Sequence, residues 1–266
     1  MTGTSDVTAW TPAVPGVREV FHARFTEHAY PPHTHDAWAV LILDHGAIRY
    51  DLDRRHHGAA GTSVTVLPPY VPHDGRAAVS TGFCKRVLYL EPDVLGDDVI
   101  AKAVDGPTFA DPELRHRMDQ LHRAVAEPGD ELAAESRLAF VRERIRQRFA
   151  AEPDGQPGRS APGKLADEMR SVLDSHIVDG ITLERAAGLL SAHPTHLVRA
   201  FTRRFGLPPH MYLTGRRIDL ARRLLLAGLA PADVAARAGF YDQAHLTRHF
   251  TRYLGVPPGR YAAAPR

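Results

Sequence analysis

Three histidines in the first third of the chain have residue types and a spacing that could support metal chemistry. His33 and His35 are two positions apart, so on a strand both side chains project from the same face. His73 follows the proline-rich segment PPYVP, where the chain can turn. Imidazole nitrogens bind first-row transition metals, and three of them leave room for a further ligand. The histidines are therefore candidate metal ligands; the alternative is that they line a pocket or satisfy the backbone of a turn.

A second set of candidate residues lies in an internal repeat. Residues 196–212 overlay residues 245–261 without a gap, with ten identities in 17 positions and the shared pattern HLxRxFTRxxGxPPxxY. In each copy, a leucine and a phenylalanine four positions apart are expected to share the buried face of a helix. The other faces carry arginine, glutamine, threonine and small apolar side chains. In a major groove arginine pairs with guanine, glutamine pairs with adenine, and the small side chains can contact thymine methyl groups.

The distribution of charge supports nucleic acid as the target of these faces. The whole chain has a formal net charge of only +2. Residues 164–266 hold 15 lysines and arginines against 8 aspartates and glutamates, a balance of +7, whereas residues 1–163 hold 18 against 23, a balance of −5. A basic segment fused to an acidic remainder indicates a polyanion-binding module attached to another domain. The alternatives are a solvated helix surface and an arginine content set by genome composition, but two repeated faces favour DNA.

Two helix-turn-helix motifs are expected to position these faces, at about residues 182–205 and 231–254. In the later motif, Gly239 can end the first helix in a left-handed conformation, and Asp242 can cap the second. A further helix over residues 211–228 has apolar residues at helical spacing and would join the two motifs. Such a helix would fix the separation of the two recognition helices.

The first part of the chain has a different sequence pattern. Over about residues 17–92, short β-rich runs alternate with turns, which favours a small barrel or sandwich. The runs cover residues 17–25, 37–43, 47–52, 62–67 and 83–90. Residues 93–150 then show apolar side chains at helical spacing. One such stripe would either pack against the barrel or mediate dimerisation, and it consists of Leu138, Val141, Ile145 and Phe149.

Length and composition describe a globular protein of two domains. The chain has 266 residues, of which 44% are hydrophobic and 24% charged. The proline- and glycine-rich segment 151–163 predicts a flexible linker between a domain over residues 1–150 and another over 164–266. No apolar run approaches the ~20 residues of a membrane helix, and the first residues lack the features of a signal peptide, so a cytoplasmic protein without membrane contact is expected. The single cysteine, Cys84, excludes a disulfide scaffold.

The stretch GFYDQAHLTRHFTRYLGVPPGRY, residues 239–261, resembles the signature of the AraC/XylS family of bacterial transcription regulators. The resemblance covers about residues 168–264 and implies two helix-turn-helix motifs that read adjacent major-groove segments of double-stranded DNA. Ser191 and His193 depart from the family pattern, which usually has glycine and serine there, so the first recognition helix is expected to be less rigid. The DNA-contacting residues that the resemblance implies are Pro194, Thr195, Val198, Arg199, Gln243, Ala244, Thr247 and Arg248. The repeat adds the matching arginines Arg203 and Arg252 as candidates.

The first part of the chain looks like the cupin-type effector domain common in that family, over about residues 17–92. The segments that carry this resemblance are HAYPPHTHDAWAVLILDHGAIRYDL, PPYVPH and GFCKRVLYLEP. A cupin would bring His73 near the other two histidines. Enzymatic cupins generally add a glutamate a few residues after the first pair, where this chain has Ala39 and Val40. The candidate effector-binding residues are Arg24, His33, His35, Trp38, Tyr50, Tyr70 and His73.

The sequence therefore predicts an α+β protein with an N-terminal, cupin-like small β-barrel plus helices and a C-terminal all-α domain with two helix-turn-helix motifs. The predicted function is a non-enzymatic, sequence-specific transcription regulator that responds to a small-molecule effector. It is expected to act as a homodimer without a cofactor, and to contact RNA polymerase if it is an activator. The alternative is a metal-dependent cupin enzyme that uses His33, His35 and His73. A non-specific DNA binder is disfavoured because the outward residues of the two copies differ.

Overall fold

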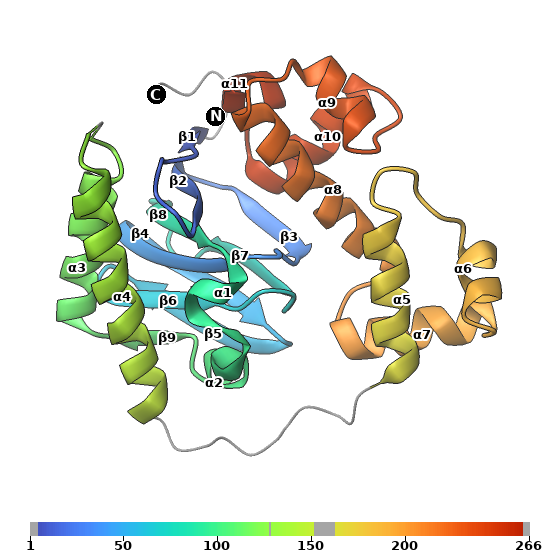
Figure 1. Cartoon of the computed structure of the whole chain (residues 1–266), viewed down its shortest axis with the longest axis horizontal. Helices are drawn as coiled ribbons and strands as arrows, with labels where there is room; N and C mark the ends of the chain where they lie inside the picture. The colour runs from blue at the N-terminus through green and yellow to red at the C-terminus, as the bar shows by residue number, and fades with distance from the viewer. Residues whose placement is uncertain (1–4, 128, 152–162, 263–266) are drawn as a thin grey trace.

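The β-rich half of the molecule is built on a sheet whose strand pairs are all antiparallel. The computed structural model describes residues 5–127, 129–151 and 163–262, and within these residues the sheet has nine strands (Figure 1). One path through the sheet runs β1-β2-β8-β4-β6-β9, while β5 and β7 also pair with β4, and β3 pairs with β7. The strands are β1 (Ser5–Trp10), β2 (Val17–Phe25), β3 (Ala29–His33), β4 (Trp38–Leu52), β5 (Arg55–Ala60), β6 (Ser63–Leu67), β7 (His73–Ala77), β8 (Phe83–Leu90) and β9 (Thr108–Ala110).

Strand β4 takes part in two layers of the sheet because it bends in its middle. Its first half pairs with β6 and β8, and its second half pairs with β5 and β7. Gly46 lies at the bend with a φ of +76°, next to a register shift that follows Leu43. A Cβ atom at Gly46 would lie 2.1 Å from the carbonyl oxygen of Gly82, so a side chain there would force the two strands apart. The predicted runs 37–43 and 47–52 are therefore one curved strand.

Alternation along β4 separates two hydrophobic cores. Leu41 faces the space inside the curved sheet, whereas Val40 faces the opposite side. The helices α3 (Pro112–Ala124) and α4 (Glu131–Ala151) lie side by side and cover that opposite side (Figure 1). The sheet thus has an outer core under the helices and an inner core within its curve.

The helical stripe that the sequence singled out belongs to the outer core. Leu138, Val141, Ile145 and Phe149 are all buried there against the sheet. This confirms the packing interpretation of the stripe and leaves these side chains unavailable to a second chain. The remaining short helices of this region are α1 (Pro92–Leu95), the 3-10 helix η1 (Asp97–Val99) and α2 (Ile100–Asp105).

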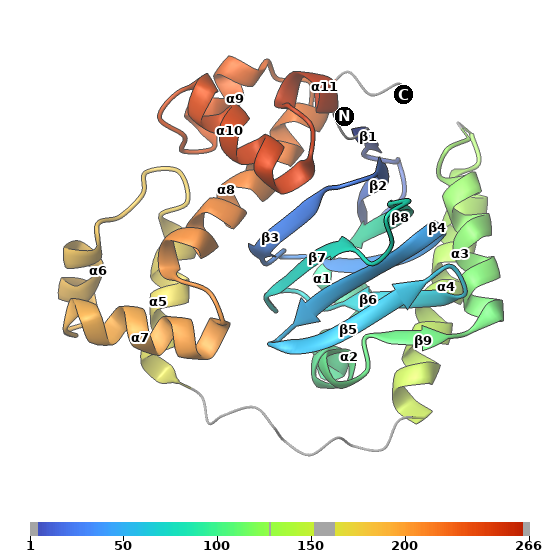
Figure 2. The same cartoon turned by 180° about the vertical axis from the view of Figure 1, so that it is seen from behind.

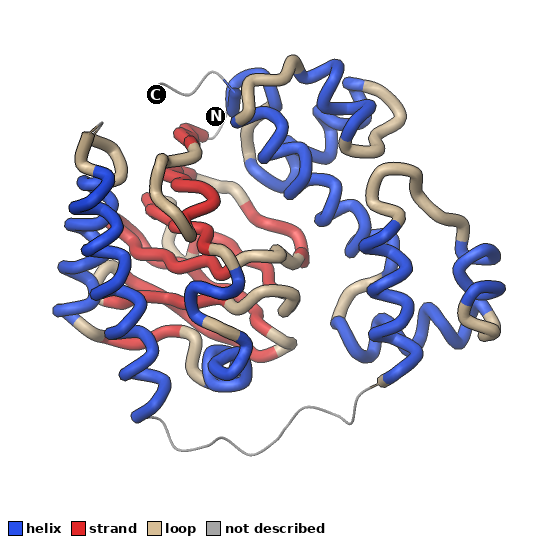
Figure 3. Tube along the Cα trace, viewed as in Figure 1, coloured by secondary structure: helices blue, strands red, loops and turns tan. Residues whose placement is uncertain are grey.

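The C-terminal half is helical throughout its described residues, as predicted (Figure 3). Helices α6 and α7 form the first helix-turn-helix pair, α9 and α10 form the second, and α8 joins them. The four side chains predicted to be buried in the two recognition helices, Leu197, Phe201, Leu246 and Phe250, are fully buried. The helices are α5 (Lys164–Ser175), α6 (Leu183–Leu189), α7 (Pro194–Phe205), α8 (Pro209–Leu226), α9 (Pro231–Arg237), α10 (Gln243–Leu254) and α11 (Pro258–Ala262).

Between the two halves, α4 ends at Ala151 and α5 begins at Lys164. The predicted linker over 151–163 falls on residues 152–162, which lie outside the described residues, so the domain limits stay a prediction. The halves nevertheless pack on one another: α8 and α10 lie against β3 (Figure 2). Ile218 and Phe250 of the helical half share one hydrophobic cluster with Phe21 of the sheet. The inner core is therefore continuous from the sheet into the second helix-turn-helix motif.

Candidate functional site

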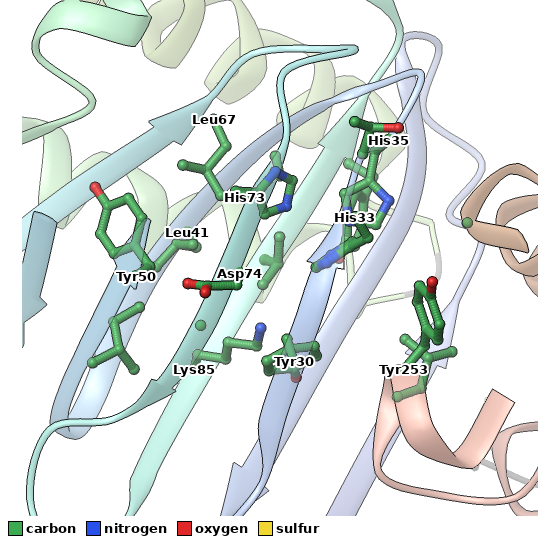
Figure 4. A pocket seen from close by; sticks show the side chains of 18 of the residues that line it. Tyr30, His33, His35, Leu41, Tyr50, Leu67, His73, Asp74, Lys85 and Tyr253 are labelled. Carbon is green, nitrogen blue, oxygen red and sulfur yellow. The ribbon is translucent and has the colours of Figure 1, made fainter. Parts of the chain in front are cut away.

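A cavity lies where the curved sheet meets α8 and α10 (Figure 4). It offers about 50 Å³ to the centre of a water-sized molecule, which is room for a few waters or a narrow ligand. The sheet supplies most of the wall, and two helices of the C-terminal half complete it. Their contributions are Gly215, Ile218, Asp219 and Arg222 from α8 and Tyr253 and Leu254 from α10. The cavity therefore belongs to both halves of the molecule.

Four of the seven predicted effector-binding residues line this cavity. They are His33, His35, Tyr50 and His73. The structure brings His73 beside the other two histidines because β7, which begins at His73, pairs with the end of β3. The resemblance to a cupin therefore placed this cluster correctly.

The other three predicted effector-binding residues do not line the cavity. Trp38 is fully buried in the outer core, where its Nε1 donates a hydrogen bond to the carbonyl oxygen of Pro92 at 3.2 Å. Arg24 is exposed on the outer face of β2. Strand alternation accounts for both, because the residues on either side of each face the inner core, so Trp38 and Arg24 point away from it. Tyr70 lies at the junction between the halves, with its ring 5.8 Å from the guanidinium carbon of Arg216.

One ring nitrogen of each cavity histidine is held by an oxygen atom. The Nδ1 atoms of His33 and His73 lie 2.7 and 3.0 Å from the backbone carbonyl oxygen two residues earlier. The Nδ1 atom of His35 lies 2.9 Å from Oδ1 of Asp219, which comes from α8. Ring centroids in the cluster are 4.4 to 5.2 Å apart. These contacts fix the orientation of all three rings.

The cavity histidines are neutral near pH 7. Burial lowers the pKa of His73 to about 4. Burial, and then the neighbouring His73, lower the pKa values of His33 and His35 well below their ordinary value. Neutral imidazoles retain a lone pair, which makes them acceptors or metal ligands rather than cationic donors.

Lys85 is a cavity residue that the sequence analysis did not single out. On β8 it lies two positions from both Phe83 and Val87, so the three side chains share the strand face that lines the cavity. Its Nζ lies 4.0 Å from the centre of the Tyr30 ring, and within the described residues no acidic side chain forms an ion pair with it. Burial, and then the charge of Arg222, lower the pKa of Lys85 to about 7. Sequence reasoning could have found Lys85 as a lysine among apolar residues on the inward-facing side of a strand.

Buried charges on α8 connect the helical half to the sheet. Arg216, Asp219 and Arg222 are spaced by three, so they share one face of the helix. Nη2 of Arg216 donates to Asp36 at 3.0 Å, and Nη2 of Arg222 donates to Glu19 at 2.6 Å. The sequence analysis missed these pairs because their partners are 180 and 203 positions apart.

The ten predicted DNA-contacting residues lie on the sides of α7 and α10 that face away from the buried leucines and phenylalanines. The arginines Arg199, Arg203, Arg248 and Arg252 are exposed. The other six are exposed or half-buried, and they are Pro194, Thr195, Val198, Gln243, Ala244 and Thr247. The two helices therefore present polar, cationic surfaces that can enter a groove of DNA.

The starts of the two recognition helices differ. Asp242 accepts a hydrogen bond from the backbone of α10 at 2.6 Å, whereas Nδ1 of His193 accepts one from the backbone of α7 at 3.3 Å. In the turn before α7, Ser191 has a φ of +47°, a left-handed conformation that Gly239 adopts before α10. The first motif thus has a longer capping bond and a more strained turn, and its lower rigidity stays a prediction.

Comparison with known proteins matches both halves of the chain. Residues 15–139 match the model of the AraC-like ligand binding domain, and residues 186–264 match a helix-turn-helix domain. The uncharacterised HTH-type transcriptional regulator YbfI of Bacillus subtilis is 25% identical over 237 residues, covering 85% of this chain and 84% of its own. The HTH-type transcriptional activator RhaS of an Enterobacter species is 23% identical and covers 82% of each chain.

A solved structure of ToxT from Vibrio cholerae, bound to an unsaturated fatty acid, has a similar fold with a TM-score of 0.59. It is 12% identical and covers 99% of this chain and 96% of that one. Its class is identified by the two family matches, by their order along the chain, and by the related regulators that span most of its length. The chain is an AraC-family transcription regulator with a ligand-binding domain followed by a helix-turn-helix DNA-binding domain.

These relatives favour a regulator over the alternative of a metal-dependent enzyme that uses the three histidines. The predicted α+β fold class is confirmed, with a sheet-rich first half and a helical second half. No helix in the described ranges has the length and apolarity needed to cross a membrane.

Proposed function

We propose that this regulator reads two successive major-groove segments with α7 and α10, and that a small effector in the cavity controls how they are presented. The observation that carries the proposal is that α10 takes part in both sites. Arg248 is exposed on its outer side, whereas Tyr253 and Leu254 at its end form part of the cavity wall. A ligand that moves this wall therefore moves a recognition helix directly.

The separation of the recognition helices supports binding along one side of the duplex. Helix α8 between them has 18 residues. At the standard rise it spans about 27 Å, on the order of the ~34 Å between major-groove segments one turn apart. The basic balance of the C-terminal segment favours phosphate contacts, which release counterions and make binding salt-dependent.

For the effector we propose a small molecule with an apolar body and an anionic group such as a carboxylate. Of the cationic groups that line the cavity, Lys85 has its amine buried and no acidic partner among the described side chains, and an anion beside it would favour its charged form. The fatty acid bound to ToxT, a carboxylate on an apolar chain, has this chemistry. The narrow volume indicates a slender ligand, or a ligand that spreads the wall when it binds.

Selection of bound sequences from random double-stranded DNA with the full-length protein tests the DNA-binding role. The selected sequences are expected to share two elements about one helical turn apart. Arg248→Ala is expected to weaken binding to the selected sequence by about 1–3 kcal/mol and to relax the preference at one position, because it removes a contact to a base edge.

Arg55→Ala is the matched control, since Arg55 lies on β5 with its side chain 53% exposed, outside both recognition helices. Its affinity for the selected sequence should equal that of the wild type. An equal loss in both variants, or the absence of any preferred sequence, would contradict the assignment of α10 as a recognition helix.

A thermal-shift screen of carboxylic acids against their neutral amide analogues tests the effector class. An acid that raises the melting temperature of the wild type more than its amide does is expected to lose that advantage in Lys85→Met, because the charge-assisted hydrogen bond is gone. Lys164→Met, at a side chain that is 90% exposed, should behave as the wild type. An undiminished preference for the acid in Lys85→Met would count against Lys85 as the anion partner.

We further propose a cytoplasmic homodimer that associates through the exposed side of α4, where Leu132 and Phe140 are 78% and 55% exposed. Exposed apolar side chains beside a groove between α3 and α4 support this face. Sedimentation of the wild type over a range of concentrations tests the dimer, and a monomer at every concentration would exclude it.

If the protein activates transcription, RNA polymerase is the further partner, to be tested by transcription with purified components.

A further inference from the structure

The cavity histidines have the geometry of metal ligands. One ligand nitrogen from each of His33, His35 and His73 lies within 4.8 Å of the other two, and all three residues are buried. We infer that these histidines bind a divalent transition-metal ion such as Zn²⁺, and that Asp219 of the DNA-binding half completes the site from behind His35. The inference concerns a resident ion and does not depend on which effector the protein recognises.

Hydrogen bonding sets the tautomers in the way that a metal site requires. Carbonyl and carboxylate oxygens accept hydrogen bonds, so the Nδ1 atoms of the three histidines act as donors. The proton on Nδ1 leaves the lone pair on Nε2 of each neutral ring. Within the described residues, no donor forms a hydrogen bond to any of these three Nε2 atoms. Each ring in this tautomer can offer its Nε2 lone pair to a cation.

Asp219 supplies the outer carboxylate that such sites commonly have. A metal-bound histidine usually donates its second ring N–H to a carboxylate or a backbone carbonyl, which orients the ring and strengthens it as a ligand. Here His35 donates to Asp219 at 2.9 Å, and the other two histidines donate to backbone carbonyls. The sequence showed no carboxylate near the first pair because Asp219 is 184 positions away, in α8.

Metal binding would pull on the contact between the two halves. Three nitrogens about 2.1 Å from a tetrahedral ion lie about 3.4 Å from one another. The present spacing of up to 4.8 Å therefore has to shorten by up to about 1.4 Å, which draws the rings inward. Because His35 is hydrogen-bonded to Asp219, this contraction acts on α8, the helix that joins the two recognition motifs.

The other charges around the cavity allow a cation to bind. The positive charge of Arg222 is already met by Glu19 at 2.6 Å and by Asp219 at 3.5 Å.

Calorimetric titration of the chelator-stripped, full-length protein with Zn²⁺ tests this inference. One ion is expected to bind each chain and to raise its melting temperature. His33→Ala and His73→Ala should each lower the affinity on the order of 100-fold or more, because each removes a ligand. Asp219→Asn should still bind one ion, but about 10–100-fold more weakly, because only the outer carboxylate is changed.

His56→Ala is the matched control, because His56 lies on β5 with its side chain 86% exposed, and it should bind Zn²⁺ as the wild type does. Circular dichroism of the metal-free variants establishes that they are folded. A wild type that binds no Zn²⁺ overturns the inference without any variant, and unchanged binding in both His33→Ala and His73→Ala overturns it as well. Unchanged affinity in Asp219→Asn overturns the role of Asp219.

The DNA selection described above, performed on the stripped protein, separates this inference from the proposed function. A protein that selects a DNA sequence but binds no Zn²⁺ contradicts the metal site alone. A protein that binds Zn²⁺ through the histidines but selects no DNA sequence contradicts the proposed function alone.

Discussion

Lys85 shows how the environment of a single residue links stability to pH. Its amine is buried in a cavity that three neutral histidines also line, and its contacts include the faces of Tyr30 and Phe21. Burial penalises the charged form, which is why its pKa falls from 10.5 to about 7. Keeping a lysine at such a position costs stability, and the cost is offset where the site binds an anion.

We therefore expect the free energy of unfolding to rise with pH between about 7 and 10. In this window the unfolded chain keeps the proton of Lys85 and the folded chain has released it, so raising the pH favours folding. The slope approaches ~1.4 kcal/mol per pH unit. Lys85→Met should remove this slope and be more stable than the wild type at pH 7. Urea denaturation at pH 7, 8 and 9 measures this, and parallel slopes in the two proteins would refute it.

Residues of the site differed in how far the sequence could predict them. His33 and His35 stand out by their spacing, and the resemblance to a cupin added His73. Asp219 could not be found in this way because its role depends on contact between two halves whose relative position no local pattern encodes. Trp38 was predicted to bind the effector because of its aromatic side chain. Such a side chain on a curved strand can face either core, and in the structure Trp38 faces the outer one.

At the scale of elements, the two helix-turn-helix motifs reach similar geometry by different local means. The second motif uses Gly239 at the left-handed position and Asp242 as the cap. The first has Ser191 and His193 at the corresponding places, and its turn is one residue shorter. A side chain in the left-handed region costs about 1–2 kcal/mol, which glycine avoids.

Ser191→Gly is consequently expected to stabilise the protein by about 0.5–1 kcal/mol, less than the full strain because glycine also frees the unfolded chain. Urea denaturation measures the change. Ser171→Gly, within the regular helix α5, is the matched control and should destabilise by about 0.5–1 kcal/mol. Destabilisation by Ser191→Gly would show that the side chain contributes more than its backbone strain costs.

Elements with a strong apolar pattern could be predicted, and those without one could not. The run 17–25 is strand β2 over the same residues, and the helical stripes became α3 and α4. Strands β5 and β7 were missed because their sequences, RHHGAA and HDGRA, are polar and contain glycine. These strands form because the second half of β4 offers them a backbone to pair with, which is a tertiary effect.

At the scale of the whole molecule, an ion-pair network holds the halves together. Arg222 of α8, Tyr261 of α11 and Glu19 of β2 are mutually hydrogen-bonded and buried. Part of the opposite charge of the two halves is therefore paired across this interface. The sequence could not show that part of this charge is neutralised by ion pairs at a buried interface and is therefore unavailable to DNA.

Glu19→Gln is expected to lower the free energy of unfolding by roughly 3 kcal/mol, because it leaves the buried charge of Arg222 without its main partner. The pair of Asp6 and Arg260 also joins the two halves, but at the surface, with side chains 67% and 56% exposed. Asp6→Asn should therefore cost less than about 1 kcal/mol. Similar losses in the two variants would mean that burial does not strengthen the first pair.

The shared cavity wall has a consequence for how such regulators diversify. Arg248, on the exposed side of α10, and Tyr253, on the cavity side, are five residues apart in one helix. Exchanging the helical half between two relatives would transplant part of the binding pocket together with the operator preference. Chimeras joined at the linker should therefore combine features of the ligand selectivity of both parents. Lineages that acquire a new inducer are also constrained by the promoters that they already regulate.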